Sequence, residues 1–317
     1  MGAETQLTKD YAFRLGQLTS LRNGLIEMKD EICEAIGKDL GRGMFYAYIS
    51  ELHLMITEIE HTMAHLKSWM EPKVVDTPVA VGPGSSYVKA EPLGVVLVMS
   101  AWNYPVYTLL GPGHQVIAAG NCCLFKPSEV GPHCCWVLTK LITKYLDQRF
   151  YRAIPGQTEV AKSLVRMRFD MLVFTGSTQK GKLIAAAAAE HLVPCVLELG
   201  GKSPAIIDED ADPEMAANKV LFGKMPNLGQ VCIAPDYIMC HESKLKRFVA
   251  QLKKQLKDGY NDCKTPEDSG KIINDFHHKR LCNLLKDHGG EVLHGNGNAH
   301  TDSELTPTIV LNPKKDS

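Results

Sequence analysis

This sequence has no long hydrophobic run, no paired-cysteine spacing and no excess of charge of either sign. No stretch approaches about 20 uninterrupted apolar residues, the length that a membrane-spanning helix requires, so we expect no membrane span in this chain. The N-terminus lacks the apolar run of a secretory signal peptide. A formal net charge of −1 gives no reason to expect nucleic acid or an anionic membrane as a partner.

The ten cysteines show no Cys-x-x-Cys spacing. Their pattern argues against zinc sites and disulfide frameworks, and it favours reduced thiols in a cytoplasmic protein. We therefore expect no metal site. A chain of 317 residues is long enough for two domains or for one large α/β domain.

The first seventy residues have the spacing of helices. Apolar residues recur every three or four positions over residues 52–70, which lines one helix face; covering a core explains this face better than binding a partner. Residues 73–92 change character, because valines there surround Gly82-Pro83-Gly84, a pattern that predicts a β-hairpin arm.

From Gly94 onward, strand-like apolar runs alternate with helical stretches. The runs cover residues 94–99, 122–125, 171–174 and 195–197, and the helices cover 109–119, 131–145 and 181–191. This alternation predicts a doubly wound parallel sheet, a Rossmann-like α/β fold, which binds ligands at the carboxyl ends of its strands. Four polar or glycine positions follow these runs, namely Asn103, Lys126, Gly176 and Glu198.

A second α/β segment follows Glu198. We predict a strand at 203–207, a helix at 213–222 capped by Asp212, and a helix at 243–257 that Gly259 stops. Residues 308–311 have the composition of a strand that finds no obvious partner downstream.

Cys232 and Glu198 are a candidate nucleophile and a candidate general base. A thiol can form a covalent intermediate, and a carboxylate can activate the water that releases the product. Cysteine is also common as a small buried hydrophobe, and the alternative for Glu198 is an ion pair with a lysine. Asn103 is a candidate oxyanion donor through its amide, although asparagine before a proline is also common in turns.

A glycine-rich loop between a predicted strand and helix nearly matches a P-loop. Its residues are Gly176, Ser177, Thr178, Gln179, Lys180 and Gly181. Leu183 stands where a P-loop has a Ser or Thr, so binding of a dinucleotide pyrophosphate is favoured over NTP hydrolysis; a plain strand–helix turn is the other alternative. Lys126 and Glu129 follow another strand, where they could contact ribose hydroxyls or remain solvated charges.

Taken together, these segments resemble the aldehyde dehydrogenase superfamily, most closely its class 3, fatty-aldehyde-type branch. The matching segments are Pro92-Leu93-Gly94-Val95, Trp102-Asn103-Tyr104-Pro105, Ala119-Gly120-Asn121-Cys122, Lys126-Pro127-Ser128-Glu129, Phe174-Thr175-Gly176-Ser177-Thr178, Glu198-Leu199-Gly200-Gly201-Lys202-Ser203-Pro204 and Gly229-Gln230-Val231-Cys232-Ile233-Ala234-Pro235. They occur in family order along nearly the whole chain.

The resemblance implies oxidation of aldehydes to carboxylic acids with NAD or NADP as cofactor. It assigns Cys232 as nucleophile, Glu198 as base and Asn103 as oxyanion donor. It also places Lys126 and Glu129 at the adenosine ribose and residues 176–181 at the pyrophosphate. Family members of this class accept medium-chain, fatty or aromatic aldehydes.

The resemblance further implies a domain organisation. Residues 1–72 and 93–198 would form the dinucleotide-binding domain, residues 73–92 an oligomerisation hairpin, and residues 199–317 a truncated catalytic domain. Family members continue for roughly another 120–150 residues, a domain-sized length. With that C-terminal part present we expect a homodimer; the alternative is a catalytically silent, truncated form that binds nucleotide or a partner subunit.

This chain departs from the family pattern at four places. Ala101 replaces a usual proline, Lys180 a common valine and Val231 a common threonine before the nucleophile. The region 150–158 is shorter than the family's Gly-Gly turn, which predicts a change on the adenine side of the cofactor.

Overall fold

A computed structural model describes residues 4–261, 270–295 and 305–314, and the chain divides into two compact units. The first comprises Met1–Ala35 and Ala47–Leu199, and the second comprises Ile36–Tyr46 and Gly200–Ser317. Residues 36–46 lie within the predicted dinucleotide-binding domain and belong to the second compact unit, while the bounds of the functional domains stay a prediction. Two hydrogen bonds join this segment to the rest of the second unit: the N–H of Lys271 donates to the Leu40 carbonyl, and Lys271 Nζ donates to the Lys38 carbonyl, both at 2.7 Å.

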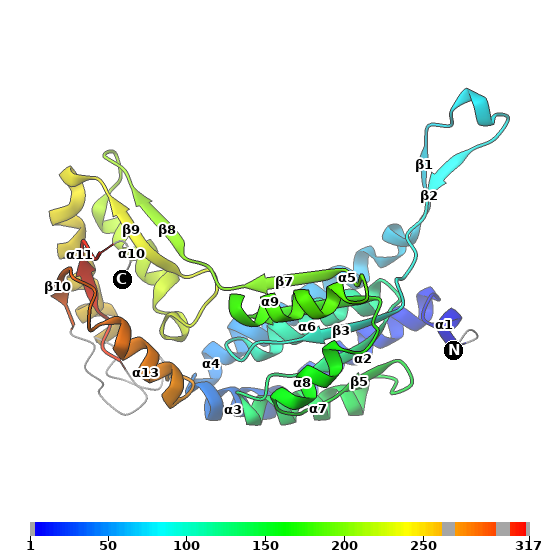
Figure 1. The fold of residues 1–317 in the computed structure, drawn as a ribbon, viewed down its shortest axis with the longest axis horizontal. Coiled ribbons are helices and arrows are strands. Elements are labelled where there is room, and N and C mark those ends of the chain that lie inside the picture. The colour runs from blue at the N-terminus through cyan, green and yellow to red at the C-terminus, as the bar shows by residue number, and fades with distance from the viewer. Residues whose placement is uncertain (1–3, 262–269, 296–304, 315–317) are drawn as a thin grey trace. The chain divides into compact units, whose positions relative to one another are not determined.

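The first unit contains the predicted alternation of strands and helices (Figure 1). Its elements are α1 (Glu4–Leu7), α2 (Tyr11–Glu27), η1 (Tyr48–Leu52), α5 (His53–Met70), β1 (Lys73–Val75), η2 (Val79–Val81), β2 (Ser86–Val88), β3 (Val95–Met99), α6 (Pro105–Ala118), β4 (Cys122–Lys126), α7 (Pro132–Tyr145), β5 (Tyr151–Ala153), α8 (Thr158–Val165), β6 (Met171–Gly176), α9 (Thr178–Ala189) and β7 (Cys195–Leu199). Helix α3 (Lys29–Leu40) runs from the first unit into the second.

Five parallel strands form the central sheet, in the order β5-β4-β3-β6-β7. The predicted α/β fold with a parallel sheet is confirmed. The chain winds outward from β3 to β5 and then returns to the other side of β3 through β6 and β7. The strand order reverses between β3 and β6, the position where doubly wound sheets bind ligands.

Both faces of the sheet are covered at the central strand β3, which explains its apolar residues, whereas alternate residues of the edge strand β7 are exposed. Leu97 and Met99 of β3 join a core cluster with residues of α8 and α9, while α6 packs on β3 and β4. Alternate residues of a strand point to opposite faces, so Val96 and Val98 are buried on the other side. A strand covered on both faces has no reason to alternate polar and apolar residues.

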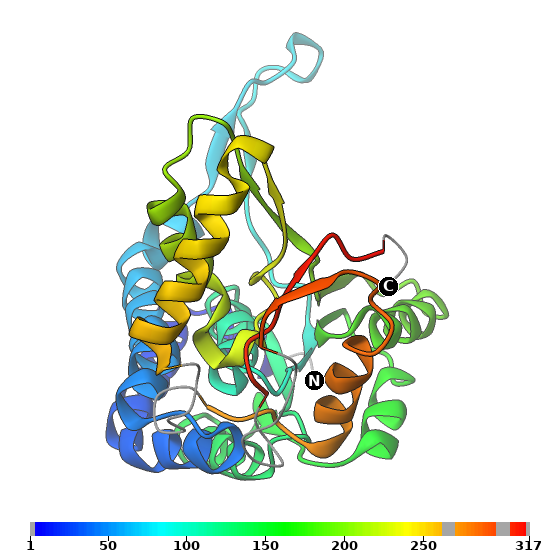
Figure 2. The ribbon, with the colours of Figure 1, turned by 90° about the vertical axis from the view of Figure 1, so that its left-hand side faces the viewer.

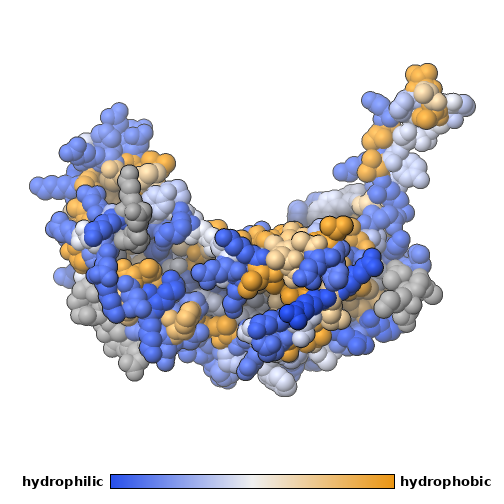
Figure 3. Space-filling model, viewed as in Figure 1, coloured by the Kyte–Doolittle hydropathy of each residue, from blue (hydrophilic) through white to orange (hydrophobic). Residues whose placement is uncertain are grey.

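The predicted hairpin arm is present as β1 paired antiparallel with β2, with Val74 opposite Tyr87. Its apolar side chains are unusually exposed, with 97% of Val79 and 82% of Val74 accessible to solvent. Figure 3 shows this hydrophobic surface in orange on the arm. An oligomerisation role for the arm stays a prediction.

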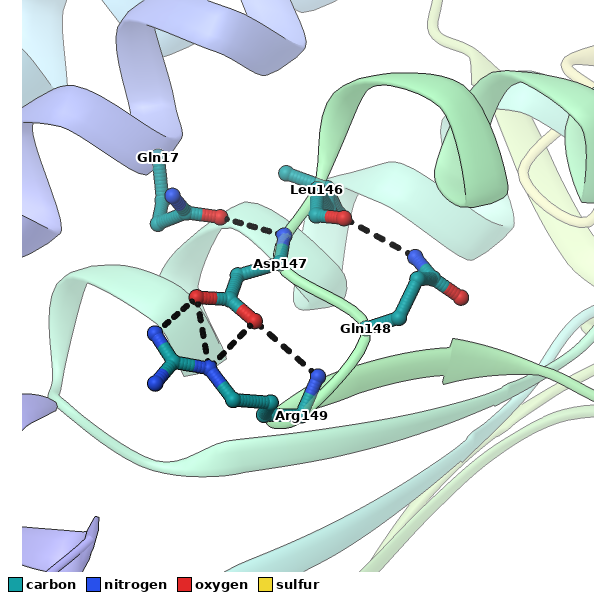
Figure 4. Close-up of polar contacts among 5 residues, drawn as sticks. All are labelled: Gln17, Leu146, Asp147, Gln148 and Arg149. Atoms are coloured by element: carbon teal, nitrogen blue, oxygen red, sulfur yellow. Dashed lines mark hydrogen bonds and ion pairs between the residues drawn. The ribbon is translucent and has the colours of Figure 1, made fainter.

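A polar network closes the turn that leads from α7 into the edge strand β5 (Figure 4). Gln17 of α2 accepts the N–H of Asp147 at 2.9 Å, and Gln148 Nε2 donates to the Leu146 carbonyl at 2.9 Å. The Asp147 carboxylate accepts the Arg149 N–H at 3.0 Å and pairs with its guanidinium at 2.7 Å. The hydrogen bond from Arg149 lowers the pKa of Asp147, so the turn is held by a charged side chain near neutral pH.

The second unit is built around two parallel strands and two long helices. Its elements are α4 (Met44–Ala47), β8 (Ser203–Ile207), α10 (Pro213–Lys224), η3 (Pro226–Gly229), β9 (Pro235–Cys240), α11 (Glu242–Tyr260), α13 (Asp275–Leu284), β10 (Glu291–His294) and β11 (Ile309–Leu311). Figure 2 shows α11, in gold, alongside α10 and the β8–β9 pair. The helices bury Val220, Leu221, Phe248 and Leu252 against Ile207 of β8.

One prediction for this unit was wrong. Helix α11 does not stop at Gly259 but runs to Tyr260, and Asn261 ends it in the left-handed conformation with φ 45°. The strand predicted at 308–311 is present as β11, and its partner lies upstream, because β11 pairs antiparallel with β10. As predicted, the Asp212 carboxylate caps α10 by accepting the N–H of Glu214 at 3.0 Å. Over the described residues, no helix is long and apolar enough to cross a membrane.

Candidate active site

The predicted site residues of the first unit lie at the carboxyl edge of the sheet. Asn103 lies in the half-buried loop between β3 and α6, Lys126 ends β4, and Gly176 ends β6. Glu198 lies on β7 directly opposite Thr175 of β6, and it is exposed. These positions meet at one edge because parallel strands point the same way.

A buried glutamate, which the sequence analysis missed, supports the Asn103 loop. Glu51 is fully buried, and its Oε2 accepts the N–H of Val106 at 2.8 Å and of Tyr107 at 3.2 Å. These are among the first N–H groups of α6, which have no partner within the helix and carry its positive dipole end. A glutamate next to the apolar run that begins at Leu52 was the signal that could have identified it.

Thr108 ties the same loop to α6. Its hydroxyl accepts the N–H of Ala101 at 3.2 Å and lies 2.9 Å from the Tyr104 carbonyl oxygen, to which it can donate. The backbone on both sides of Asn103 is therefore fixed to one side chain. A fixed loop is what a side-chain amide needs in order to donate to a developing oxyanion without rearrangement.

Lys126 is buried, so it is not one of the solvated charges that we weighed as an alternative. Its side chain is 3% exposed, and Nζ lies 2.5 Å from Glu129 Oε2 and 3.1 Å from the Pro127 carbonyl oxygen. Burial is the largest single influence on Glu129 and would raise its pKa. The hydrogen bond from Lys126 and the positive charges of Lys126 and Lys180 nevertheless lower the pKa overall.

We predict that Glu129→Ala lowers the free energy of unfolding by about 3 kcal/mol, because it leaves the Lys126 ammonium buried without a carboxylate. Urea unfolding midpoints measure this effect. The matched control is Glu159→Ala, which removes another Lys–Glu pair of the same sequence spacing whose glutamate is 83% exposed. That change should cost no more than about 0.5 kcal/mol. Equal effects of the two substitutions would contradict the prediction.

The same substitution should show a defined pH dependence. The folded-state pKa of Glu129 is lowered from its ordinary value of 4.5, so its ionised form stabilises the fold above that pH. The stabilisation is lost as the pH falls through the lowered pKa. The difference between wild type and Glu129→Ala should therefore shrink in acid.

The glycine-rich loop forms a helix N-terminus that is open to solvent. Ser177 caps α9 by accepting the N–H of Lys180 at 3.3 Å, and the N–H of Gly181 donates to the Ser177 carbonyl at 2.8 Å. Residues 177–180 are exposed. Helix N–H groups, the Lys180 ammonium and the nearby Lys126–Glu129 pair together suit an anionic dinucleotide with ribose hydroxyls. Binding of a dinucleotide pyrophosphate accounts for the loop without NTP hydrolysis.

Cys232 lies in an exposed turn just before β9. The N–H of Ala234 closes this turn by donating to the Val231 carbonyl at 3.2 Å. Three consecutive residues upstream have positive φ angles: Asn227 (52°), Leu228 (52°) and Gly229 (74°). A leucine in this region is strained, and such strain persists only where the surroundings hold it in place.

A buried network, also missed at the sequence level, provides that hold. Arg42 Nε donates to Asn227 Oδ1 at 3.1 Å, and Asn227 Nδ2 donates to the Gln230 carbonyl at 3.1 Å. Gln230 Nε2 donates to the Lys271 carbonyl at 3.0 Å, and Gln230 Oε1 accepts the N–H of Ile273 at 3.1 Å. The residues before Cys232 are thus fixed to two distant segments of the second unit.

The Gly200-Gly201 segment packs directly against the Cys232 turn. A Cβ at Gly201 would lie 2.9 Å from the Cys232 carbonyl oxygen, so only glycine permits this approach. Two lysines accompany the turn: Lys202 forms an ion pair with Asp236, and Lys224 Nζ lies 3.8 Å from the same carboxylate. Burial lowers the pKa of Lys224. The negative charge of Asp236 partly opposes this shift, and the positive charge of Lys202 adds to it.

The predicted residues therefore fall into two groups. The first unit brings Lys126, Glu129 and Lys180 together and places Asn103 and Glu198 at the same sheet edge. The second unit contains Cys232 with Gly201 against its backbone. The pairing of Cys232 with Asn103 and Glu198 remains a prediction.

Comparison with known proteins identifies the family. The sequence matches the aldehyde dehydrogenase family over residues 9–317. The chain belongs to the aldehyde dehydrogenase family. Membership makes it an aldehyde dehydrogenase, a class of enzyme that oxidises aldehydes with NAD or NADP, as the motifs predicted.

Similar proteins include class 3 members of the aldehyde dehydrogenase family. A rat protein described as "Aldehyde dehydrogenase, dimeric NADP-preferring" is 39% identical over 305 residues, covering 96% of this chain and 67% of the relative. Mouse "Aldehyde dehydrogenase family 3 member B2" is 37% identical and covers 96% of this chain and 63% of that relative. The substrate-bound structure of Staphylococcus aureus AldH is 38% identical with a TM-score of 0.94, covering 99% of this chain and 69% of that one. The chain thus spans about two thirds of the length of such proteins.

Proposed function

We propose that this chain supplies the cofactor site and the nucleophile for oxidation of an aldehyde to a carboxylic acid through a thioester at Cys232. One observation carries the proposal. The Cys232 turn is exposed, held by a buried network and packed against Gly201, and only two residues separate Gly201 from Glu198 along the chain. An exposed thiol held in this way is what covalent catalysis requires.

The first step is addition of the thiolate to the aldehyde. Cys232 Sγ forms a bond to the carbonyl carbon, and the electron pair of the C=O bond moves to oxygen. The Asn103 amide and the Cys232 backbone N–H donate to this oxyanion, and Glu51 and Thr108 hold the Asn103 loop in place. As the oxyanion electron pair re-forms the C=O bond, the C–H bond of the adduct breaks and its electron pair leaves as hydride, so that a thioester remains on Cys232. A nicotinamide held by the first unit would supply the hydride acceptor.

The second step is hydrolysis of that thioester. The Glu198 carboxylate takes a proton from water, and the water oxygen attacks the thioester carbon. The C–S bond then breaks, the electron pair returns to sulfur as thiolate, and the carboxylic acid leaves. Glu198 afterwards releases its proton to solvent, to which it is exposed.

The first unit would hold the cofactor. Lys126 and Glu129 would contact the adenosine ribose, and residues 176–181 would present helix N–H groups to the pyrophosphate. We assign residues 1–72 and 93–198 to dinucleotide binding and residues 199–317 to the catalytic domain. The buried Lys126–Glu129 pair beside Lys180 supports this assignment, because it preorganises charged groups at the sheet edge.

We further propose medium-chain, fatty or aromatic aldehydes as substrates and a homodimer assembled with the arm of residues 73–92. The exposed valines of the arm support an interface, and the rat relative is named dimeric and NADP-preferring. The nine cysteines among the described residues are free thiols, which supports a cytoplasmic setting.

The decisive experiment incubates the purified chain with a medium-chain aldehyde and either NAD or NADP while NAD(P)H absorbance is followed. We expect a rise in absorbance that depends on both aldehyde and enzyme. Cofactor binding is measured in parallel by calorimetry. Retained cofactor binding with no turnover would contradict the proposal and identify the chain as a catalytically silent, nucleotide-binding form.

A further inference from the structure

The first unit contains a cavity that the proposed reaction does not use. Its volume is about 870 Å³, and it is bounded by α5, α6, the N-terminal segment and the base of the arm. Cavities of about 300–1,000 Å³ are typical of small-molecule sites. Asn103, Lys126, Glu129, Glu198 and the glycine-rich loop do not line it.

A buried histidine of α6 faces this cavity with one ring nitrogen uncommitted. His114 is 2% exposed, and its Nδ1 lies 3.0 Å from the Leu110 carbonyl oxygen. A carbonyl only accepts, so Nδ1 carries the hydrogen and Nε2 carries a lone pair. Among the residues that the structure describes, nothing donates to Nε2. Burial lowers the pKa of His114, which keeps the ring neutral and Nε2 an acceptor.

A threonine of α5 lines the same cavity. Thr62 is 5% exposed, and its hydroxyl forms no hydrogen bond with any described residue. The hydroxyl oxygen of Thr62 keeps some accessible surface, and it opens onto the cavity. Helices α5 and α6 pack against each other, so an acceptor and a hydroxyl from two neighbouring helices line one space. A ligand hydroxyl in this cavity could therefore pair with both groups.

Each charged side chain that lines the cavity already has a partner. Arg14 Nε donates to the Thr8 carbonyl at 2.8 Å, and its Nη1 donates to the Ala118 carbonyl at 3.1 Å. Glu58 accepts from the Tyr107 hydroxyl at 2.7 Å, and the Glu91 carboxylate is paired with Lys9 at 2.7 Å and with Lys89 at 2.9 Å. The remaining walls include apolar surface from Leu66, Trp69, Met70 and Ala118. Two neutral groups on the cavity wall, His114 Nε2 and the Thr62 hydroxyl, therefore have no partner among the described residues. A ligand does not need a charge to pair with them.

We propose that this cavity binds a largely apolar molecule carrying a single hydroxyl group, an alcohol or a phenol. The ligand hydroxyl donates to His114 Nε2 and accepts from the Thr62 hydroxyl, while its apolar body lies against Leu66, Trp69 and Ala118. One hydroxyl satisfies both buried groups at once, which neither a hydrocarbon nor an ether can do.

Calorimetric titration of the purified chain with naphthol and with the methyl ether of the same naphthol tests the proposal. The ether keeps the apolar body and the oxygen but cannot donate. We expect the wild-type chain to prefer naphthol by about tenfold, the value of one neutral hydrogen bond in a buried site. His114→Leu should abolish this preference, and Thr62→Val should weaken naphthol binding by a few fold. Gln115→Ala, an exposed position that also lines the cavity, is the matched control and should keep the preference.

A second measurement keeps the test informative if His114→Leu does not fold. In the wild-type chain with ¹⁵N-labelled histidines, naphthol but not its ether should shift the Nε2 resonance of His114 in ¹⁵N NMR spectra. Equal affinities of the two probes in the wild type, an unmoved Nε2 resonance, or a preference retained in folded His114→Leu would each overturn the proposal. The same titration in Cys232→Ala separates it from the proposed function, because binding in this cavity should be unaffected by loss of the nucleophile.

Discussion

Replacing Cys232 by alanine should reduce aldehyde-dependent NAD(P)H production by about 10⁴-fold or more, since removal of a covalent nucleophile eliminates the thioester route. The affinity for NAD or NADP should stay nearly intact. The residues that we assign to the cofactor belong to the first unit, whereas Cys232 belongs to the second. Initial rates at saturating cofactor and calorimetric binding of the cofactor measure the two quantities.

A second cysteine of the same unit provides the control for this prediction. Cys240 is a half-buried free thiol at the end of β9, and it contacts the core cluster of the second unit. Cys240→Ala should keep most of the wild-type turnover. Substantial residual turnover in Cys232→Ala would remove Cys232 from the mechanism, and joint loss of cofactor binding would show that the substitution had damaged the fold instead.

Glu198→Gln should slow the steady-state rate by about 10²–10⁴-fold, because glutamine has nearly the same shape but cannot take a proton from water. Thiolate addition and hydride loss precede the step that needs this base. Rapid mixing with aldehyde and cofactor should therefore show a burst of roughly one NAD(P)H per site before the slow phase.

The outcome without a burst is equally informative. A slow rate with no burst would place the role of Glu198 before thioester formation, and an unchanged steady-state rate would exclude it as the base. Glu190→Gln serves as the control: Glu190 is an exposed carboxylate of the first unit at the C-terminal end of α9. That substitution should leave both phases unchanged.

The fold was largely readable from local pattern, and its exceptions have physical reasons. Uninterrupted apolar runs identified β3, β4 and β6, because a strand covered on both faces has few polar positions. The short run 195–197 identified β7, although alternate residues of this edge strand are exposed. Strand β5 escaped notice: it is three residues long and carries Arg152 at its centre, so it has no run to detect. The end of α11 was misplaced because Asn261, rather than a glycine, takes the left-handed cap.

The candidate site was readable only in part. The chemical types of Cys232, Glu198 and Asn103 suggested their roles, and the order of the motifs indicated the family. The burial of Lys126 could not be foreseen, because a lysine at a strand end is usually solvated. The position of Glu51 beside an apolar run was a signal of burial, but its partners Val106 and Tyr107 lie more than fifty residues away and have no local pattern.

The sequence by itself determined the strand–helix alternation, the parallel sheet, the family and the identity of the groups able to do chemistry. These features depend on residue type and short spacing, which the chain shows directly. Only the tertiary structure decided what holds those groups. Glu51 reaches an N–H 55 residues away, Arg42 reaches Asn227 across 185 residues, and the cavity of His114 and Thr62 exists because α5 packs on α6. Such contacts join residues that are far apart in the chain, and their distances arise from packing and not from local periodicity.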